Sequence, residues 1–141
     1  MADLNDKKND NLNDTLNDTL NQLTNTADTT DVYDPADIES NKIMALLSYI
    51  GILVLIPLFS SRQSPFTRFH VNQGAVLCVL EIIVWAVFGF LGAIPVIGLI
   101  FRIIRYVLQA ICLVFAVLGI YNVVQGKAKE LPFIGGIRLV K

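Results

Sequence analysis

The sequence has few of the residues from which chemical sites are usually built. It contains one histidine, His70, and two cysteines, Cys78 and Cys112. Two isolated cysteines provide neither a disulfide framework nor the Cys/His spacing of a zinc site. A single histidine without a nearby carboxylate or thiol is a weak metal ligand, and no nucleophile–base pair is evident. The sequence therefore predicts no metal, no cofactor and no enzymatic activity.

Charge of one sign is scarce in each part of the chain. Residues 1–41 carry ten acids and only two lysines, a net charge of −8, whereas residues 42–141 carry nine Lys or Arg and only Glu81 and Glu130, a net charge of +7. A nucleic-acid-binding protein would line a solvated face with its basic residues, but here they stand at the ends of long apolar runs. The hydrophobic fraction of 54% also exceeds that of soluble domains. The pattern predicts an integral membrane protein.

Three apolar stretches are long enough to cross a bilayer. Residues 43–61 and 106–126 are uncharged, and residues 71–101 contain only Glu81. A helix of about 20 apolar residues crosses the roughly 30 Å of hydrocarbon, so the middle stretch is too long for one crossing, and the segment FLGAIPVIG breaks it at residues 92–98. We predict an all-α membrane bundle of three transmembrane helices, near residues 43–60, 71–91 and 99–125. A fourth crossing would need a turn in the last of these, where nothing clearly breaks the helix.

The acidic N-terminal part has the composition of a disordered tail. Residues 9–23, NDNLNDTLNDTLNQL, repeat with a period of four and place one leucine in each repeat. Asn, Asp and Thr are poor helix formers, and one leucine in four residues buries too little apolar area to offset the cost of ordering. We predict a disordered acidic tail over residues 1–34 and a transmembrane domain over residues 35–141. The sharper alternative is a transient helix in the tail that binds a partner.

The segment SPFTRFHVNQG, residues 64–74, stands at the entrance of the second predicted span. Ser64 as N-cap and Pro65 as the first helical residue give a helix start. Rings at the acyl boundary and cations beside lipid phosphates are typical of such an entrance. We predict interfacial lipid contact for five residues: Arg62, Phe66, Arg68, Phe69 and His70. Asn72 and Gln73 are expected to hydrogen-bond to a neighbouring helix or to hold the first loop against the bundle.

Glu81 lies near the bilayer centre, ten residues from each end of the second predicted span. A carboxylate at that depth is costly unless it is paired or protonated. In the third predicted span Arg102, Arg105 and Gln109 recur at i, i+3 and i+7, on one helical face. We predict an intramembrane polar cluster of these four residues, with Glu81 packed against Arg105 and Gln109. The cluster acts either as a polar clamp that fixes helix register or as a proton- or ion-responsive site.

Basic residues near the spans predict the orientation. With three spans, the first loop and the C-terminal tail share one face, which holds six Lys or Arg: Arg62, Arg68, Lys127, Lys129, Arg138 and Lys141. The opposite face holds three close to a span: Lys42, Arg102 and Arg105. We therefore predict a multi-pass protein of the bacterial plasma membrane, with a cytoplasmic C-terminus and the acidic tail outside. The apolar C-terminal tail is expected to fold back onto the interface or onto the first loop.

Three segments together resemble a widespread family of small bacterial membrane proteins of uncharacterised function: NKIMALLSYIGILVLIPL, SPFTRFHVNQG and GIYNVVQGKAKELPFIGGIRLVK. That family is itself similar to the twenty-kilodalton membrane subunit of the chloroplast inner-envelope import translocon. The resemblance covers about residues 41–141. It implies an all-helical membrane bundle without catalytic residues or a bound cofactor, four helices in the chloroplast relatives, and a role in protein transport.

Two functions fit these features. The first is a non-enzymatic membrane subunit that binds other membrane proteins, or further copies of itself, in transport or assembly. The alternative is a small channel or ion-responsive protein organised around Glu81. A membrane-embedded enzyme would need paired acids, a histidine–metal set or an activated nucleophile, which the sequence does not supply. The expected partners are anionic lipid headgroups and membrane proteins, and nucleic acid is not among them.

Overall fold

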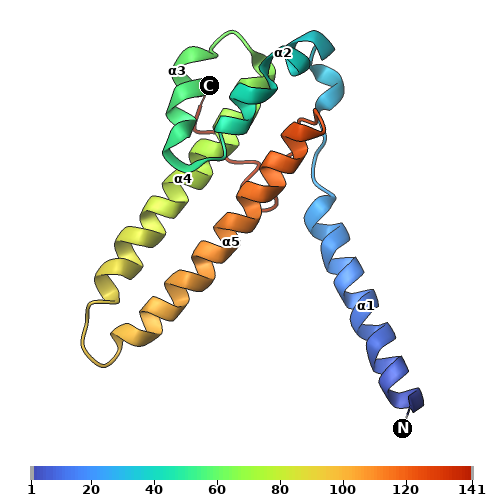
Figure 1. Ribbon diagram of the computed structural model, residues 1–141, viewed down its shortest axis with the longest axis vertical. Helices are drawn as coiled ribbons and strands as arrows, with labels where there is room; N and C mark the ends of the chain where they lie inside the picture. The colour runs from blue at the N-terminus through green and yellow to red at the C-terminus, as the bar shows by residue number, and fades with distance from the viewer. Residues whose placement is uncertain (1, 141) are drawn as a thin grey trace.

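The computed structural model describes the backbone of residues 2–140, and this part of the chain is all-helical. Its elements are α1 (Ala2–Thr24), η1 (Thr30–Val32), α2 (Pro35–Leu47), η2 (Gly51–Val54), α3 (Leu55–Ser60), α4 (Pro65–Leu91) and α5 (Gly98–Val124). Two of them, α4 and α5, are long and apolar enough to cross a membrane. They pack side by side as an antiparallel hairpin, with α2 and α3 at one end (Figure 1). The all-α prediction is therefore confirmed.

Residues close in the sequence determine where α4 begins and where the chain turns into α5. The side chain of Ser64 accepts a hydrogen bond from the Thr67 N–H, and Pro65 occupies the first turn of α4, which is a favourable helix start. The turn at residues 92–97 then reverses the chain. A Cβ on Gly98 would lie 2.5 Å from the carbonyl oxygen of Gly92. Glycine at position 98 is therefore needed for the tight connection between α4 and α5.

The prediction of three transmembrane helices is wrong, because the structure has two candidate spans. Residues 43–60, predicted as the first span, divide into the end of α2, the short η2 and α3, so that the apolar run turns back on itself (Figure 1). The turn depends on Gly51, whose φ of +50° is a conformation that glycine adopts without steric cost. Before it, the N–H groups of residues 48–50 bond to carbonyls three residues earlier. These bonds satisfy the backbone where the helix is interrupted.

The buried core lies at one end of the hairpin, where α2, α4 and α5 meet the C-terminal tail. We call this end the head; its buried apolar side chains are Ile38, Ala45, Tyr49, Phe66, Phe69, Val76, Leu77, Cys112, Ala116, Val123, Ala128, Leu131 and Ile134. Beyond the head, large apolar side chains such as Trp85 and Phe90 are exposed. Only 22% of the most apolar 18-residue segment of each long helix is buried. An exposed apolar surface of this extent is typical of a membrane-facing hairpin.

The structure also differs from the disorder predicted for residues 1–34. Residues 2–24 form helix α1, which points away from the hairpin (Figure 1). The hydroxyls of Thr15 and Thr19 donate to carbonyls four residues earlier in the same helix, so they bond within the helix instead of competing with it. Residues 26–30 are ordered because residues 128–130 of the tail give them backbone and side-chain partners.

Candidate functional site

Three polar side chains near the start of α4 are buried in the head. His70 and Gln73 are 0% exposed and Asn72 is 2% exposed. Buried polar groups in native proteins are almost always hydrogen-bonded, so the partners of these three residues decide what they can do.

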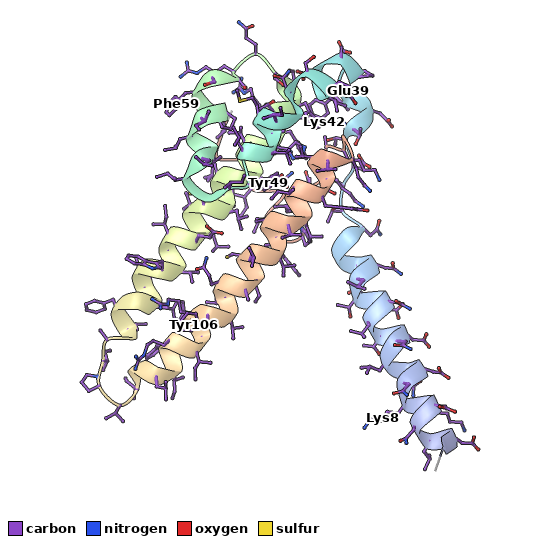
Figure 2. All side chains as sticks on the ribbon, viewed as in Figure 1. Lys8, Glu39, Lys42, Tyr49, Phe59 and Tyr106 are labelled. Carbon is purple, nitrogen blue, oxygen red and sulfur yellow. The ribbon has the colours of Figure 1, made fainter. Side chains whose placement is uncertain are left out.

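His70 joins α4 to the end of α2 and to the chain after α5. Its Nδ1 lies 2.8 Å from the Tyr49 hydroxyl, and its Nε2 lies 3.1 Å from the carbonyl oxygen of Lys127. A carbonyl only accepts, so Nε2 carries the proton and Nδ1 accepts from Tyr49. Burial raises the pKa of the Tyr49 phenol, which keeps that donor protonated. Tyr49 lies where α2 ends (Figure 2). Both ring nitrogens are occupied, so His70 is a structural crosslink with no free nitrogen for a metal.

Asn72 binds the backbone of the C-terminal tail. Its amide nitrogen donates to the carbonyl oxygen of Ile137 at 2.6 Å. Its amide oxygen accepts from the N–H groups of Leu139, at 2.7 Å, and Val140, at 2.9 Å. Because both ends of its amide group bond to tail backbone, Asn72 fixes the last described residues of the tail against α4.

Gln73, the next residue of α4, also binds the backbone of the tail. Its amide oxygen accepts from the Leu131 N–H at 2.8 Å, and its amide nitrogen lies 3.5 Å from the carbonyl oxygen of Lys129. Asn122, near the end of α5, approaches that same carbonyl at 3.4 Å. The expected partner of Asn72 and Gln73 was a neighbouring helix or the first loop; the structure gives them the tail instead.

Of the five residues expected at the lipid interface, three are buried and two are exposed. Phe66, Phe69 and His70 are buried, because the tail covers this side of α4 and Tyr33 packs edge-on against both phenylalanines. The two arginines, Arg62 and Arg68, remain exposed. Of the five residues, these two cations are the ones left exposed to meet lipid headgroups.

The structure does not bring together the four residues of the expected intramembrane cluster. Arg105 turns toward the loop end of the hairpin: its guanidinium lies 5.1 Å from the centre of the Tyr106 ring, and a Cβ on Gly89 would meet it at 3.6 Å. Tyr106 marks this region of α5 (Figure 2). Arg102 lies against Gly92 in the same region. Long basic side chains in a span extend toward the interface, which takes both arginines away from Glu81.

Glu81 is half-buried and has no ionic partner in the described part of the chain. The ion pairs among residues 2–140 join Lys42 to Glu39 at 3.2 Å and Arg138 to Glu130 at 3.4 Å, both outside the two spans. Gln109 is exposed on α5. Within residues 2–140, neither the Glu81 nor the Gln109 side chain has an ionic or hydrogen-bonding partner.

The N-terminal segment adds one electrostatic contact to the head. Asp28 accepts hydrogen bonds from the side chain and the N–H of Thr30, and these bonds hold the pKa of its carboxyl below the usual range. The positive charges of Lys127 and Lys129 act in the same direction. Within residues 2–140, no three His, Cys, Asp or Glu side chains gather closely enough to hold a metal ion.

No family model matches this sequence, and no solved structure matches it. The chain is similar to the magnetosome protein MmsF of Paramagnetospirillum magneticum, with 34% identity over 96 residues that cover 67% of this chain and 82% of MmsF. The chain belongs to the MmsF family of magnetosome proteins. Magnetosome protein MamF of the same organism is 33% identical over 94 residues, which cover 66% of this chain and 78% of MamF.

Membership of the MmsF family corrects the resemblance drawn from the sequence. The relatives are magnetosome proteins, and no similarity to the chloroplast import translocon is found. Neither relative is named as an enzyme. With its two apolar helices, this member of the MmsF family is a bacterial membrane protein.

Proposed function

We propose that this member of the MmsF family is a non-enzymatic membrane protein that assembles with other proteins of its membrane. The groups that might have performed chemistry in the head are occupied: His70, Asn72 and Gln73 all bond within the chain. The outer faces of α4 and α5 are apolar and uncovered. These two features support an assembly role in preference to a catalytic one.

Glu81 is the observation that carries the proposal. It stands within α4, in an apolar run where a carboxylate is costly unless it is protonated or paired. Residues 2–140 give Glu81 no ionic partner. In the proposed assembly, a donor on another membrane helix forms a hydrogen bond with the Glu81 carboxyl group. Interhelical hydrogen bonds of this kind stabilise membrane assemblies. The channel alternative is not favoured, because its predicted Glu81–Arg105–Gln109 cluster does not form.

Trp85 lies beside Glu81 on the helix surface, one turn further along α4. It is 68% exposed, which makes it a suitable site for a photo-crosslinking residue. A residue placed there would report on any helix that packs over the carboxylate.

Crosslinking in native membranes tests the assembly role. With the photo-reactive residue at position 85, we expect one reproducible crosslinked membrane protein, identified by mass spectrometry. Glu81→Leu should lower its yield about fivefold, the loss of one interhelical hydrogen bond of about 1 kcal/mol, while Glu81→Gln, which still hydrogen-bonds, should retain most of it. Val79→Leu is the matched control on the same helix. A yield that is equal in all four proteins would contradict the proposal.

The orientation proposed here follows from the two spans. Among residues 2–140, six Lys or Arg flank the head side: Lys42, Arg62, Arg68, Lys127, Lys129 and Arg138. Only Arg102 and Arg105 flank the loop side. This asymmetry supports a cytoplasmic head and C-terminus, and it moves the acidic N-terminal part, expected outside, to the cytoplasmic side as well. The relatives' names make a magnetosome the first membrane in which to look for the protein.

A further inference from the structure

A cavity of about 350 Å³ opens on the head between α3, the start of α4 and the end of the tail. Its walls are of two kinds. Arg62 and Arg68 provide the polar wall, and the apolar wall includes Pro57, Phe59, Val71 and Val140. Among residues 2–140, no carboxylate lines the cavity.

No side chain within residues 2–140 neutralises the positive charge in this cavity. Arg62 and Arg68 form no ion pair or hydrogen bond with any residue from 2 to 140. The first N–H groups of α4 are already bonded and do not contribute: the Phe66 N–H donates to the Asp37 carboxylate at 3.1 Å, and the Thr67 N–H donates to Ser64 at 3.1 Å. The ligand must therefore be recognised by the two guanidinium groups, which bind phosphate oxygens in a fixed planar geometry.

The apolar wall continues into an exposed apolar surface on α3. Phe59 projects from the outer side of α3 (Figure 2) and is 64% exposed, and Leu55 and Ile56 on the same short helix are also exposed. Exposed aromatic and aliphatic side chains beside unpaired arginines match the boundary between acyl chains and headgroups. A free phosphate ion would leave this wall uncovered.

We propose that the cavity binds an anionic phospholipid, with the headgroup phosphate between Arg62 and Arg68 and the upper part of an acyl chain along Phe59 and Val71. The bound lipid joins α3 to α4 on the cytoplasmic side of the membrane. This inference rests on the proposed placement of the head at the membrane surface, and it does not require a protein partner at Glu81.

Lipid retention tests the site on the full chain, purified in a non-ionic detergent. Phosphatidylglycerol and phosphatidylcholine are added in turn, and the bound lipid is counted by native mass spectrometry. Phosphatidylglycerol should be retained about tenfold better, and the double variant Arg62→Gln, Arg68→Gln should abolish this preference. The matched control, Lys7→Gln with Lys8→Gln on exposed α1, loses the same charge and should keep it. Circular dichroism confirms that both double variants remain helical.

Two further arms separate a lipid site from a simple anion site. Excess inorganic phosphate should not displace phosphatidylglycerol, and Phe59→Ser should weaken retention without removing the charge preference. Displacement by phosphate, equal retention of the two lipids by the unaltered protein, or equal losses in the two double variants would overturn the lipid site. Crosslinking from position 85 in the Arg62, Arg68 double variant should be unchanged, so failure of one proposal is distinguishable from failure of the other.

Discussion

At the scale of single residues, the head is held together by side-chain amides that bond to backbone. Asn72 alone satisfies one carbonyl and two N–H groups of the last four described residues. A side chain that bonds to backbone in this way does not depend on which side chains the tail carries. The end of the tail is therefore positioned by α4 through its backbone.

Replacing Asn72 with Ala should release the end of the tail while leaving the spans intact. Three hydrogen bonds are lost, each worth about 1 kcal/mol, so amide exchange in residues 137–140 should accelerate by about tenfold or more. Hydrogen exchange with mass spectrometry measures this directly. Gln125→Ala is the control, because the Gln125 side chain donates to the exposed Tyr121 hydroxyl and does not hydrogen-bond to the tail backbone of residues 137–140. Unchanged exchange in the Asn72 variant would mean that the tail is held by its apolar contacts alone.

At the scale of the helices, close approach to glycine determines how the head packs. A Cβ on Gly74 would lie 1.8 Å from the carbonyl oxygen of Ser48, so α4 touches the backbone at the end of α2. A Cβ on Gly119 would lie 2.2 Å from the Tyr49 ring. Small residues allow helix backbones to approach in membrane proteins, and here they allow the broken apolar run to dock on the hairpin.

Gly74→Ala should therefore destabilise the head by about 3 kcal/mol, the upper range for overpacking, because backbone must move to admit the methyl group. The measurement is the thermal unfolding midpoint in detergent, where we expect a clear decrease. Gly136→Ala is the matched control, since nothing lies within 4 Å of its Cβ position, and its midpoint should stay within experimental error. Equal midpoints for the two variants would show that α2 does not pack on α4 in this way.

At the scale of the whole molecule, the number of spans decides where the termini lie. Two spans place the N-terminal segment and the tail at the same end, and in the structure they touch: the Thr29 N–H donates to the Ala128 carbonyl at 3.0 Å, and the Glu130 N–H donates to the Ala27 carbonyl at 2.9 Å. Three spans would have separated these segments by the thickness of the bilayer.

Cysteine labelling in intact cells that carry the protein in the plasma membrane tests this topology. In a protein with Cys78 and Cys112 replaced by Ala, a membrane-impermeant reagent should label Val96→Cys, which lies in the turn and is 95% exposed. If the head is cytoplasmic, as proposed, Thr26→Cys and Leu139→Cys should be labelled only after permeabilisation. Labelling of positions 26 and 139 from opposite sides would restore three spans. Labelling of both from outside would keep two spans and reverse the orientation.

Features set by residues adjacent in the chain could be predicted from the sequence, whereas features set by contacts between distant segments could not. Ser64 and Pro65 mark the start of α4 because capping is local, and the glycines and proline at 92–98 mark the turn for the same reason. Residues 43–60 have the length and apolarity of a span, but whether they cross depends on Gly51 and on the fit of Ser48 against Gly74, which lies in another helix. Pattern alone could not show that contact.

The sequence by itself determined that this is a helical membrane protein, because the free energy of burying long uncharged runs depends on composition and length. Only the tertiary structure decided how many runs form helices long enough to cross, what His70, Asn72 and Gln73 bind, and that Glu81 has no arginine partner among the described residues. Those outcomes depend on which segments meet in space, since a hydrogen bond requires its two groups within about 3 Å of each other.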